Sequence, residues 1–416
     1  MKANDEATKF SCRQEEEKQE IWSWGAGTDG QLGTGSLQDE LSPQLLKLPS
    51  LFSAGPISQL ACGGAHVVAL TSGGRVLTWG RGLSGQLGHG DMVNNPIPKL
   101  VMLLEPYFIT QVSAGWNHSG FVSDSGSLFT CGDGSFGQLG HGDYKSHYSP
   151  VKVSYFVNNH VEQMACGMRH SLVLLKLQGH SGDQIYAFGS GKRGQLGISK
   201  DKVNLVSLPE VTCGLEGINI VGIAANGDHS AALSDDGNFY TWGRGFQGKS
   251  DAYYPEHVTT SLYFTKAALG WNHALLLTGS GEACMLGGNR HGVLSSLDKM
   301  SAPKYMQDSN VLLEEVPGLD GQEVVDIAAG AEHSALITVS DFPLMVMAEK
   351  GAVKTWGWGE HGQLGLGNTI DQTSPQGVTL GHEVPTEAVT SKVYCGSGFT
   401  IVIRTKDVLY PLAGCK

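Results

Sequence analysis

Short apolar runs and glycine turns alternate along the whole chain. Val67–Leu70 is followed by Gly73 and Gly74, and then by a second apolar run, Val76–Trp79. An apolar run, a tight turn and another apolar run are typical of a β-hairpin. Residues 171–175, 231–242 and 274–277 continue this design, and no long amphipathic helical pattern lies between them. The pattern therefore predicts a protein of short antiparallel strands.

Two motifs recur through these hairpins with a period of roughly 50 residues, which is typical of a solenoid or a propeller. The first reads W-G-x-G-x-x-G-Q-L-G where it is complete, as in Trp24–Gly33, and the second reads G-x-x-H, as in Gly63–His66. The residues that open the first motif are Trp24, Trp79, Cys131, Phe188, Trp242, Leu286 and Trp356. The residues that end the second motif are His66, His118, His170, His229, His273, His333 and Phe399. Two longer spacings place insertions at residues 176–184 and 340–350.

The two ends of the chain carry complementary halves of one repeat. Residues 24–33 form the first motif without a preceding second motif, and Cys395–Ile403 is the second motif without a following first. Four-stranded blades arranged radially suit repeats of this length and leave few free sheet edges. We predict an all-β fold, a seven-bladed β-propeller over residues 21–405, closed by strands from both ends in one blade. An acidic tail at 1–20 and a short tail at 406–416 complete the domain prediction.

Composition narrows the classes of partner. The chain has 58 glycines, which suits many tight turns, and a net charge of −12 with no Lys/Arg cluster. Binding to a phosphate backbone needs a basic footprint, so nucleic acid is disfavoured as a partner. The sequence has no signal-peptide pattern and no apolar run long enough for a bilayer, so we expect a soluble intracellular protein in the cytoplasm, the nucleus or both. Cys62, Cys166 and Cys395 share one repeat position, and we interpret them as small buried thiols.

Two patterns imitate nucleotide-binding loops. Gly25, Gly27 and Gly30 match the dinucleotide fingerprint, but the match recurs in other repeats and no helix pattern follows it. Gly243–Ser250 satisfies the Walker A pattern, yet the following residues, 251–255, are poor helix formers. We interpret both as turns and expect no cofactor.

The repeated histidines could suggest a metal or catalytic site. They occur once per repeat, so they cannot converge on one ion, and no carboxylate accompanies them at a fixed offset. We predict a structural role in which each imidazole bonds to backbone within its own blade. The sequence does not single out any Ser/His/Asp set or any pair of carboxylates as a candidate catalytic site. We therefore expect no metal, no catalytic residues and no enzyme activity.

Function in a repeat protein is expected where the repeat is broken. Repeats five and six have lost Gln-Leu-Gly, and the insertion of repeat six contains Phe342, Leu344 and Met345. An exposed apolar loop marks an interaction site, so this insertion is a candidate docking segment. The alternative is a longer hairpin that folds onto its own blade.

The tandem motifs resemble the repeat of the regulator-of-chromosome-condensation family over about residues 21–405. The resemblance implies a seven-bladed propeller closed by strands from both ends. The founding member of that family is a guanine-nucleotide exchange factor for the small GTPase Ran and binds chromatin. Its basic N-terminal tail is replaced here by the acidic run Glu15–Glu17, and no exchange-catalysing residue can be transferred to this chain.

A second resemblance is to the plant ultraviolet-B photoreceptors, in which tryptophans of G-W-R-H-T motifs stack at a dimer face beside arginines. This chain has Trp116 and Trp271 in comparable motifs, but asparagine follows each tryptophan. Because the two motifs are three repeats apart, we predict that these tryptophans do not stack together, and light sensing by that mechanism is disfavoured. By analogy, the equivalent positions line one face of the ring. The residues that follow them on this face are Ala65, Asn117, Arg169, Asp228, Asn272, Glu332 and Gly398.

These observations favour a non-enzymatic interaction scaffold. The candidate binding residues are Trp116, Asn117, Arg169, Asp228, Trp271, Asn272, Glu332, Phe342, Leu344 and Met345. We expect a monomer that binds a protein partner, with a small GTPase as one candidate, and that does not bind a membrane. The alternative is guanine-nucleotide exchange on a small Ran-like GTPase.

Overall fold

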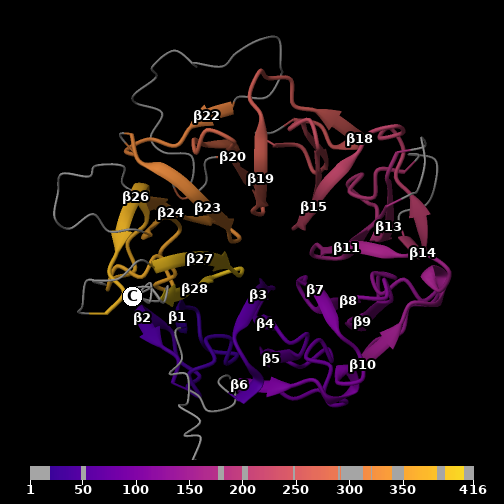
Figure 1. Cartoon of the computed structure of the whole chain (residues 1–416), viewed down its shortest axis with the longest axis horizontal. Helices are drawn as coiled ribbons and strands as arrows, with labels where there is room; N and C mark the ends of the chain where they lie inside the picture. The colour runs from indigo at the N-terminus through magenta and orange to yellow at the C-terminus, as the bar shows by residue number, and fades with distance from the viewer. Residues whose placement is uncertain are drawn as a thin grey trace, which may run out of the picture.

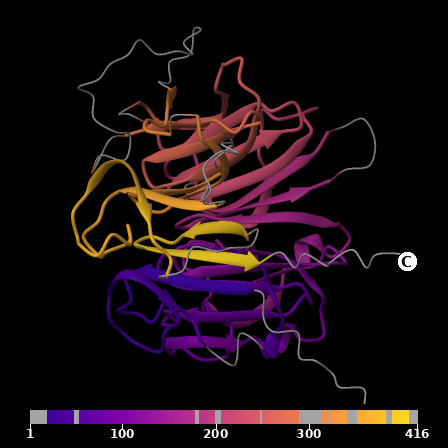
Figure 2. The same ribbon diagram turned by 60° about the vertical axis from the view of Figure 1, so that its left-hand side comes forward.

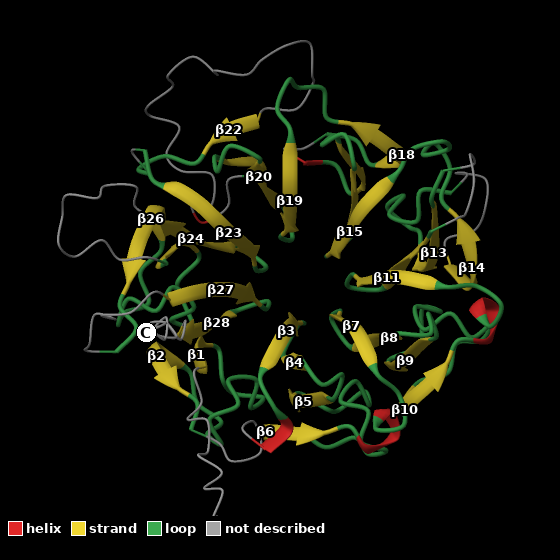
Figure 3. Ribbon diagram, viewed as in Figure 1, coloured by secondary structure: helices red, strands yellow, loops and turns green. Residues whose placement is uncertain are grey.

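Seven four-stranded antiparallel sheets surround a central axis and form a closed ring (Figure 1). The computed structural model describes residues 19–47, 53–176, 182–198, 205–246, 249–288, 291, 313–319, 321–339, 351–381 and 389–406. Strands dominate the described residues, and 3₁₀ turns such as η1 (Met102–Leu104) and η2 (Ser154–Phe156) lie between blades (Figure 3). The all-β, seven-bladed propeller predicted from the repeats is confirmed.

We name the blades A to G around the ring, starting with the blade that contains both chain ends. Blade B has β3 (Ile57–Cys62), β4 (His66–Thr71), β5 (Val76–Gly80) and β6 (Asn95–Leu100). Blade C has β7 (Ile109–Ala114), β8 (His118–Ser123), β9 (Leu128–Gly132) and β10 (His147–Lys152). Blade D has β11 (Val161–Cys166), β12 (His170–Leu175), β13 (Gln184–Ser190) and β14 (Leu205–Val211).

The remaining complete blades follow the same order, with the first strand nearest the axis (Figure 1). Blade E has β15 (Ile220–Asn226), β16 (His229–Ser234), β17 (Phe239–Gly243) and β18 (Ala252–His257). Blade F has β19 (Phe264–Leu269), β20 (His273–Thr278), β21 (Ala283–Gly287) and β22 (Leu313–Glu315). Blade G has β23 (Glu323–Ala329), β24 (His333–Val339), β25 (Ala352–Gly357) and β26 (Gln372–Val378).

Blade A joins the two ends of the chain, as the complementary half-repeats predict. Its strand order is β2 (Glu40–Leu45), β1 (Gln19–Gly25), β28 (Phe399–Lys406) and β27 (Val389–Cys395). β1 and β28 pair in unbroken register from Gln19 with Thr405 to Gly25 with Phe399. Figure 2 shows the yellow C-terminal strands next to the indigo N-terminal ones. The ring is therefore closed by hydrogen bonds between segments almost 400 residues apart in the sequence.

The first motif links neighbouring blades. The indole Nε1 of Trp79 donates to the carbonyl of Gln31 in the preceding blade at 3.0 Å, and Trp24 and Trp242 make the same contact with Gln363 and Gln195. The tryptophan side chains are fully buried. A buried indole N–H needs an acceptor, so the Trp and Gln positions of the motif form one polar link inside an apolar interface.

The repeated histidines form a second link between blades. His66 Nε2 lies 2.9 Å from Ser119 Oγ of the next blade, and the Ser119 hydroxyl donates to the carbonyl of Gln86. Nε2 must therefore carry the hydrogen and donate it to the serine. The same contact recurs at His118, His170, His273 and His333. The structural role predicted for the histidines is correct, but the predicted partner is wrong: these five bond to a hydroxyl of the next blade, and His229 to a carbonyl of the next blade.

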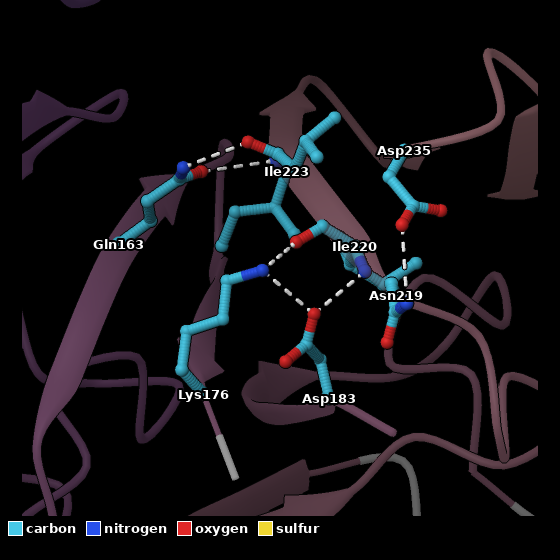
Figure 4. A network of polar contacts seen from close by, with 8 residues as sticks. Gln163, Lys176, Asp183, Asn219, Ile220, Ile223 and Asp235 are labelled. Carbon is cyan, nitrogen blue, oxygen red and sulfur yellow. Dashed lines mark hydrogen bonds and ion pairs between the residues drawn. The ribbon is translucent and has the colours of Figure 1, made fainter. Parts of the chain in front are cut away.

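The stem of the insertion in blade D fastens that blade to blade E (Figure 4). Lys176 Nζ lies 2.8 Å from Asp183 Oδ2, and this carboxylate oxygen also accepts the backbone N–H of Ile220 at 2.7 Å. Nearby, Gln163 bonds through its amide to the carbonyl of Val221 and the N–H of Ile223. The insertion therefore leaves and rejoins the blade at an ion pair in which Asp183 is buried and Lys176 is exposed.

Candidate partner-binding face

Seven short loops gather around the axis at one end of the ring. Each connects the innermost strand of a blade to its second strand and contains the residues between the Gly and His positions of the second motif. Backbone hydrogen bonds tie successive loops together, for example Trp116 N to Gly167 O at 3.2 Å and Met168 N to Gly227 O at 2.9 Å. We call this end the axial face. The analogy that places these positions on one face is correct.

Two tryptophans meet across the axis of this face. Trp116 belongs to blade C and Trp271 to blade F, and both are half-buried. Their ring centroids are 5.2 Å apart with an interplanar angle of 47°. The rings are tilted and not stacked, but the inference that separation by three repeats keeps the two indoles apart is wrong. Three blades of separation place the two loops on opposite sides of a narrow ring, where they meet. Trp116 lies against Gly64 of blade B, and Trp271 against Gly227 of blade E, so glycine makes room for each indole.

The other predicted residues of the axial face surround this pair. The guanidinium of Arg169 lies 4.8 Å above the ring of Phe136. Asp228 Oδ1 accepts a hydrogen bond from Gln195 Nε2 at 3.2 Å, and Asn272 Nδ2 donates to Glu332 Oε1 at 3.4 Å. Asn117 Oδ1 is buried with no hydrogen-bond partner in the structure. Phe342, Leu344 and Met345 lie outside the described residues.

A row of histidine–carboxylate contacts flanks the axial face and was missed by sequence reasoning. His291 Nε2 lies 3.1 Å from Glu332 Oε2, and its Nδ1 lies 2.9 Å from Asp371 Oδ2. In the next blade His361 Nδ1 lies 3.0 Å from Asp39 Oδ2. His291 and His361 both precede the third glycine position of the first motif, which is the signal that could have revealed these contacts.

A cavity of about 350 Å³ follows the axis and is lined by both tryptophans and by Cys62, Cys166 and Cys395. Burial raises the pKa of Cys166 to about 12 and that of Cys395 to about 12. These thiols are therefore protonated at neutral pH, and a thiol in that state is a poor nucleophile and metal ligand. Cys166 is buried as predicted, whereas Cys62 and Cys395 are half-buried, and no disulfide joins the described cysteines.

The protein-family model for the RCC1-like domain matches residues 20–402 of this chain, which is nearly the whole propeller. The chain belongs to the RCC1-like domain family. Among its relatives is the ultraviolet-B receptor UVR8 of Arabidopsis thaliana, 30% identical over 360 residues that cover 84% of this chain and 75% of the relative. Another is the secretion-regulating guanine nucleotide exchange factor of Mus musculus, 29% identical over 409 residues that cover 92% of this chain and 83% of the relative.

The fold of this RCC1-like chain is shared by solved structures. The structure of Prp20p from Saccharomyces cerevisiae, described with its binding to Gsp1p and histones, superposes with a TM-score of 0.77. The two sequences are 24% identical, and the match covers 94% of this chain and 92% of Prp20p. The family resemblance inferred from the tandem motifs is confirmed.

In this RCC1-like propeller the nucleotide-binding patterns are turns, as predicted. Gly25 and Gly30 have φ angles of +103° and +83°, a backbone region that favours glycine. Within the Walker-like pattern Lys249 N bonds to Phe246 O, and the next element after the pattern is the strand β18, which begins at Ala252. A P-loop requires a helix N-terminus facing the phosphates, and the described residues after Lys249 form none.

The described part of the RCC1-like chain shows no group of three or more His, Cys, Asp or Glu side chains arranged to hold a metal ion. Within the same residues, no helix is both long and apolar enough to cross a bilayer. The repeated histidines lie in separate interfaces between blades and share no common site.

Proposed function

We propose that this protein is a non-enzymatic interaction scaffold that binds a protein partner through its axial face. The observation that carries the proposal is the contact between Trp116 and Trp271, which places two half-buried indoles at the centre of one face. Tryptophan is enriched among the residues that dominate binding energy in protein interfaces, and such residues cluster near the interface centre. Arg169, Asp228 and Glu332 supply charges of both signs around the indoles, as expected for a polar rim.

The test is capture of partners by the wild-type protein and by a Trp116→Ala/Trp271→Ala double variant. Val325→Ala is the matched control, because Val325 is exposed on β23 at the other end of the ring. The proposal expects that the double variant loses the partners that the wild type and the control both recover. Equal recovery by all three folded proteins would contradict it.

The second candidate function is guanine-nucleotide exchange on a small GTPase. It is favoured by the relative named as a secretion-regulating guanine nucleotide exchange factor, whose match covers 92% of this chain. An exchange factor needs no catalytic side-chain constellation of its own, because it acts by binding a GTPase and displacing its nucleotide. This candidate is therefore a special case of partner binding in which the partner is the GTPase.

Release of labelled GDP across a panel of small GTPases distinguishes the two functions. Exchange predicts accelerated release from at least one GTPase in the presence of the purified protein. Release at the spontaneous rate from every member would exclude exchange on the panel and leave the scaffold proposal standing.

A further inference from the structure

Backbone hydrogen bonds between the axial loops are interrupted at one place in the ring. A loop N–H bonds to a carbonyl of the next blade between A and B, B and C, C and D, D and E, F and G, and G and A. Between blades E and F the described residues make no such bond, because the N–H of Gly227 bonds to the side chain of Asn226 in its own blade. Blade E departs from the motif here, with Asn226 at the first glycine position.

A second recurring contact is also missing between blades E and F. The side chain of the third residue of an innermost strand usually forms hydrogen bonds to the backbone of the next blade, a contact that we call the clasp. Gln111 Nε2 donates to Met164 O at 2.9 Å, and Gln111 Oε1 accepts from Met164 N at 3.0 Å. Gln59 and Gln163 form the same clasp, and ionic side chains replace it in the other blades, for example Lys266 with Asp326. Blade E has Gly222 at this position, which has no side chain to reach blade F.

The two links of the sequence motifs fail at the same interface. Ala274 stands where five other blades have a serine or threonine hydroxyl, and Leu286 stands where four other blades have the tryptophan of the first motif. Elsewhere in the ring, blade B lacks the hydroxyl and blades C and D lack the tryptophan, so only the interface between E and F lacks both. Apolar contacts fill the space, because Phe246, Leu286 and Ala274 belong to one cluster shared by blades E and F. Apolar packing is not directional, whereas hydrogen bonds fix the relative position of two surfaces.

Two side-chain contacts hold blade F in place of these links, one to the last residue of β19 and one to Trp271 in the loop that follows. Asn226 Nδ2 donates to Leu269 O at 2.6 Å, and His229 Nε2 lies 2.7 Å from Trp271 O. The indole of Trp271 then reaches across the axis to Trp116. The Trp116–Trp271 contact therefore ties blade F to blade C on the far side of the interrupted interface.

We propose that the interface between blades E and F, which we call the joint, is the interface of the ring that opens most readily. We further propose that the Trp116–Trp271 contact holds this joint closed. Blade F shifts against blade E at this joint while the other six interfaces hold their geometry. Because Trp271 belongs to both the joint and the axial face, a shift of blade F separates the two indoles. The joint exists whether or not a partner binds, so it is tested on the isolated protein.

Two buried cysteines report on the joint and on a control interface. Cys284 belongs to the apolar cluster between blades E and F, and Cys131 to the cluster between B and C. Both thiols are at most 1% exposed, so each reacts only when its interface opens. Alkylation of the native full-length protein by iodoacetamide, followed site by site with mass spectrometry, measures the two openings separately.

The decisive variant restores the clasp that blade E lacks. Gly222→Gln places an amide opposite blade F, and an added Cβ at this position meets only Leu233 Cβ at 4.0 Å. The matched control is Gly222→Met, which has similar length without an amide. Since one or two new hydrogen bonds change a local opening equilibrium by about tenfold, Gly222→Gln should slow alkylation of Cys284 by about tenfold relative to Gly222→Met and leave Cys131 unchanged.

The reverse variant tests the control interface. Gln59→Met removes the clasp between blades B and C and should accelerate alkylation of Cys131 without changing Cys284. The proposal is overturned if Cys284 reacts at the same rate in Gly222→Gln and Gly222→Met. It is also overturned if Cys131 and Cys284 change together in every variant, because global unfolding and not a joint would then expose both.

Discussion

His66 Nε2 in blade B donates to the hydroxyl of Ser119 in blade C, 2.9 Å away. This hydrogen bond is one example of a contact that recurs between neighbouring blades around the ring. The serine in turn donates to the carbonyl of Gln86. The His and Ser positions of one motif and the Gln position of the other therefore act together at the interface between blades. Between blades A and B both partners are lost, because Phe399 replaces the histidine of blade A and Val67 of blade B supplies no hydroxyl. Between blades E and F only the hydroxyl is lost, and His229 bonds to Trp271 O instead.

Removing the hydroxyl should destabilise the ring. Ser119→Ala leaves the His66 N–H without its acceptor in a fully buried site. Because a buried unpaired donor costs about 1–3 kcal/mol, the free energy of unfolding should fall by that amount. Ser72→Ala, at an exposed turn residue, is the control and should change stability by less than about 0.5 kcal/mol. Equal denaturation midpoints for both variants would show that the link contributes nothing.

The buried histidines predict loss of stability in mild acid. Burial lowers the pKa of His66, His170, His273 and His333 to about 3 and that of His118 and His229 to about 4, from an ordinary value of 6.5. The unfolded chain therefore binds more protons than the folded one between pH 6.5 and about 4. Their stabilising contribution is complete above pH 6.5 and falls as the pH drops through this window.

Each of these histidines lowers the free energy of unfolding by up to about 1.4 kcal/mol per pH unit in that window. Urea denaturation at pH 7.5, 6.0 and 5.0 measures the effect. We expect nearly constant stability above pH 7 and a steep decrease below pH 6. A flat profile down to pH 5 would mean that the imidazoles are not held neutral by burial.

The motif glycine that lies against His118 should tolerate no side chain. A Cβ at Gly115 would lie 2.5 Å from Cε1 of His118 and 2.4 Å from the carbonyl oxygen of Gly167. Gly115→Ala should therefore cost roughly 3 kcal/mol or more, because the backbone must shift to relieve both contacts. Gly377→Ala is the control, since nothing lies within 4 Å of its added Cβ. Thermal unfolding of the two variants should differ by many degrees; similar melting temperatures would contradict the packing described.

Ring closure through blade A predicts different outcomes for two truncations. Ending the chain before Phe399 removes β28, which pairs with both β1 and β27, and should prevent folding of the ring. Deleting residues 1–18 leaves β1 intact and should leave the melting temperature unchanged. Circular dichroism of both proteins checks the prediction. A folded, cooperative product of the first truncation would show that closure in blade A is dispensable.

The fold was predictable because its repeat signals are local and redundant. The hairpin of Val67–Leu70 and Val76–Trp79 is visible in the apolar pattern, and the half-repeats at the two ends predict the closed blade. The partner of each histidine was not predictable in this way, since the hydroxyl belongs to the next repeat and is about 53 residues away, as from His66 to Ser119.

The contact between Trp116 and Trp271 escaped prediction for a geometrical reason. Separation along a ring of blades does not set distance in space at the axis, where loops from opposite blades meet across the centre. The carboxylate contacts of His291 join residues from three places in the sequence, so the motif position of the histidine does not identify Glu332 and Asp371 as its partners. The sequence therefore predicts the propeller fold. The contacts at the centre of the axial face join residues from distant repeats, which meet only when the ring of blades is closed.

The most direct test of the axial face as the binding surface is an affinity measurement. Each protein captured by the wild type is purified and titrated calorimetrically against the wild type, Trp116→Ala/Trp271→Ala and Val325→Ala, with folding checked by circular dichroism. Because a central tryptophan contributes about 2 kcal/mol or more to binding, we predict at least a tenfold higher Kd for the double variant and an unchanged Kd for Val325→Ala. An unchanged Kd for the folded double variant with every partner would contradict the account.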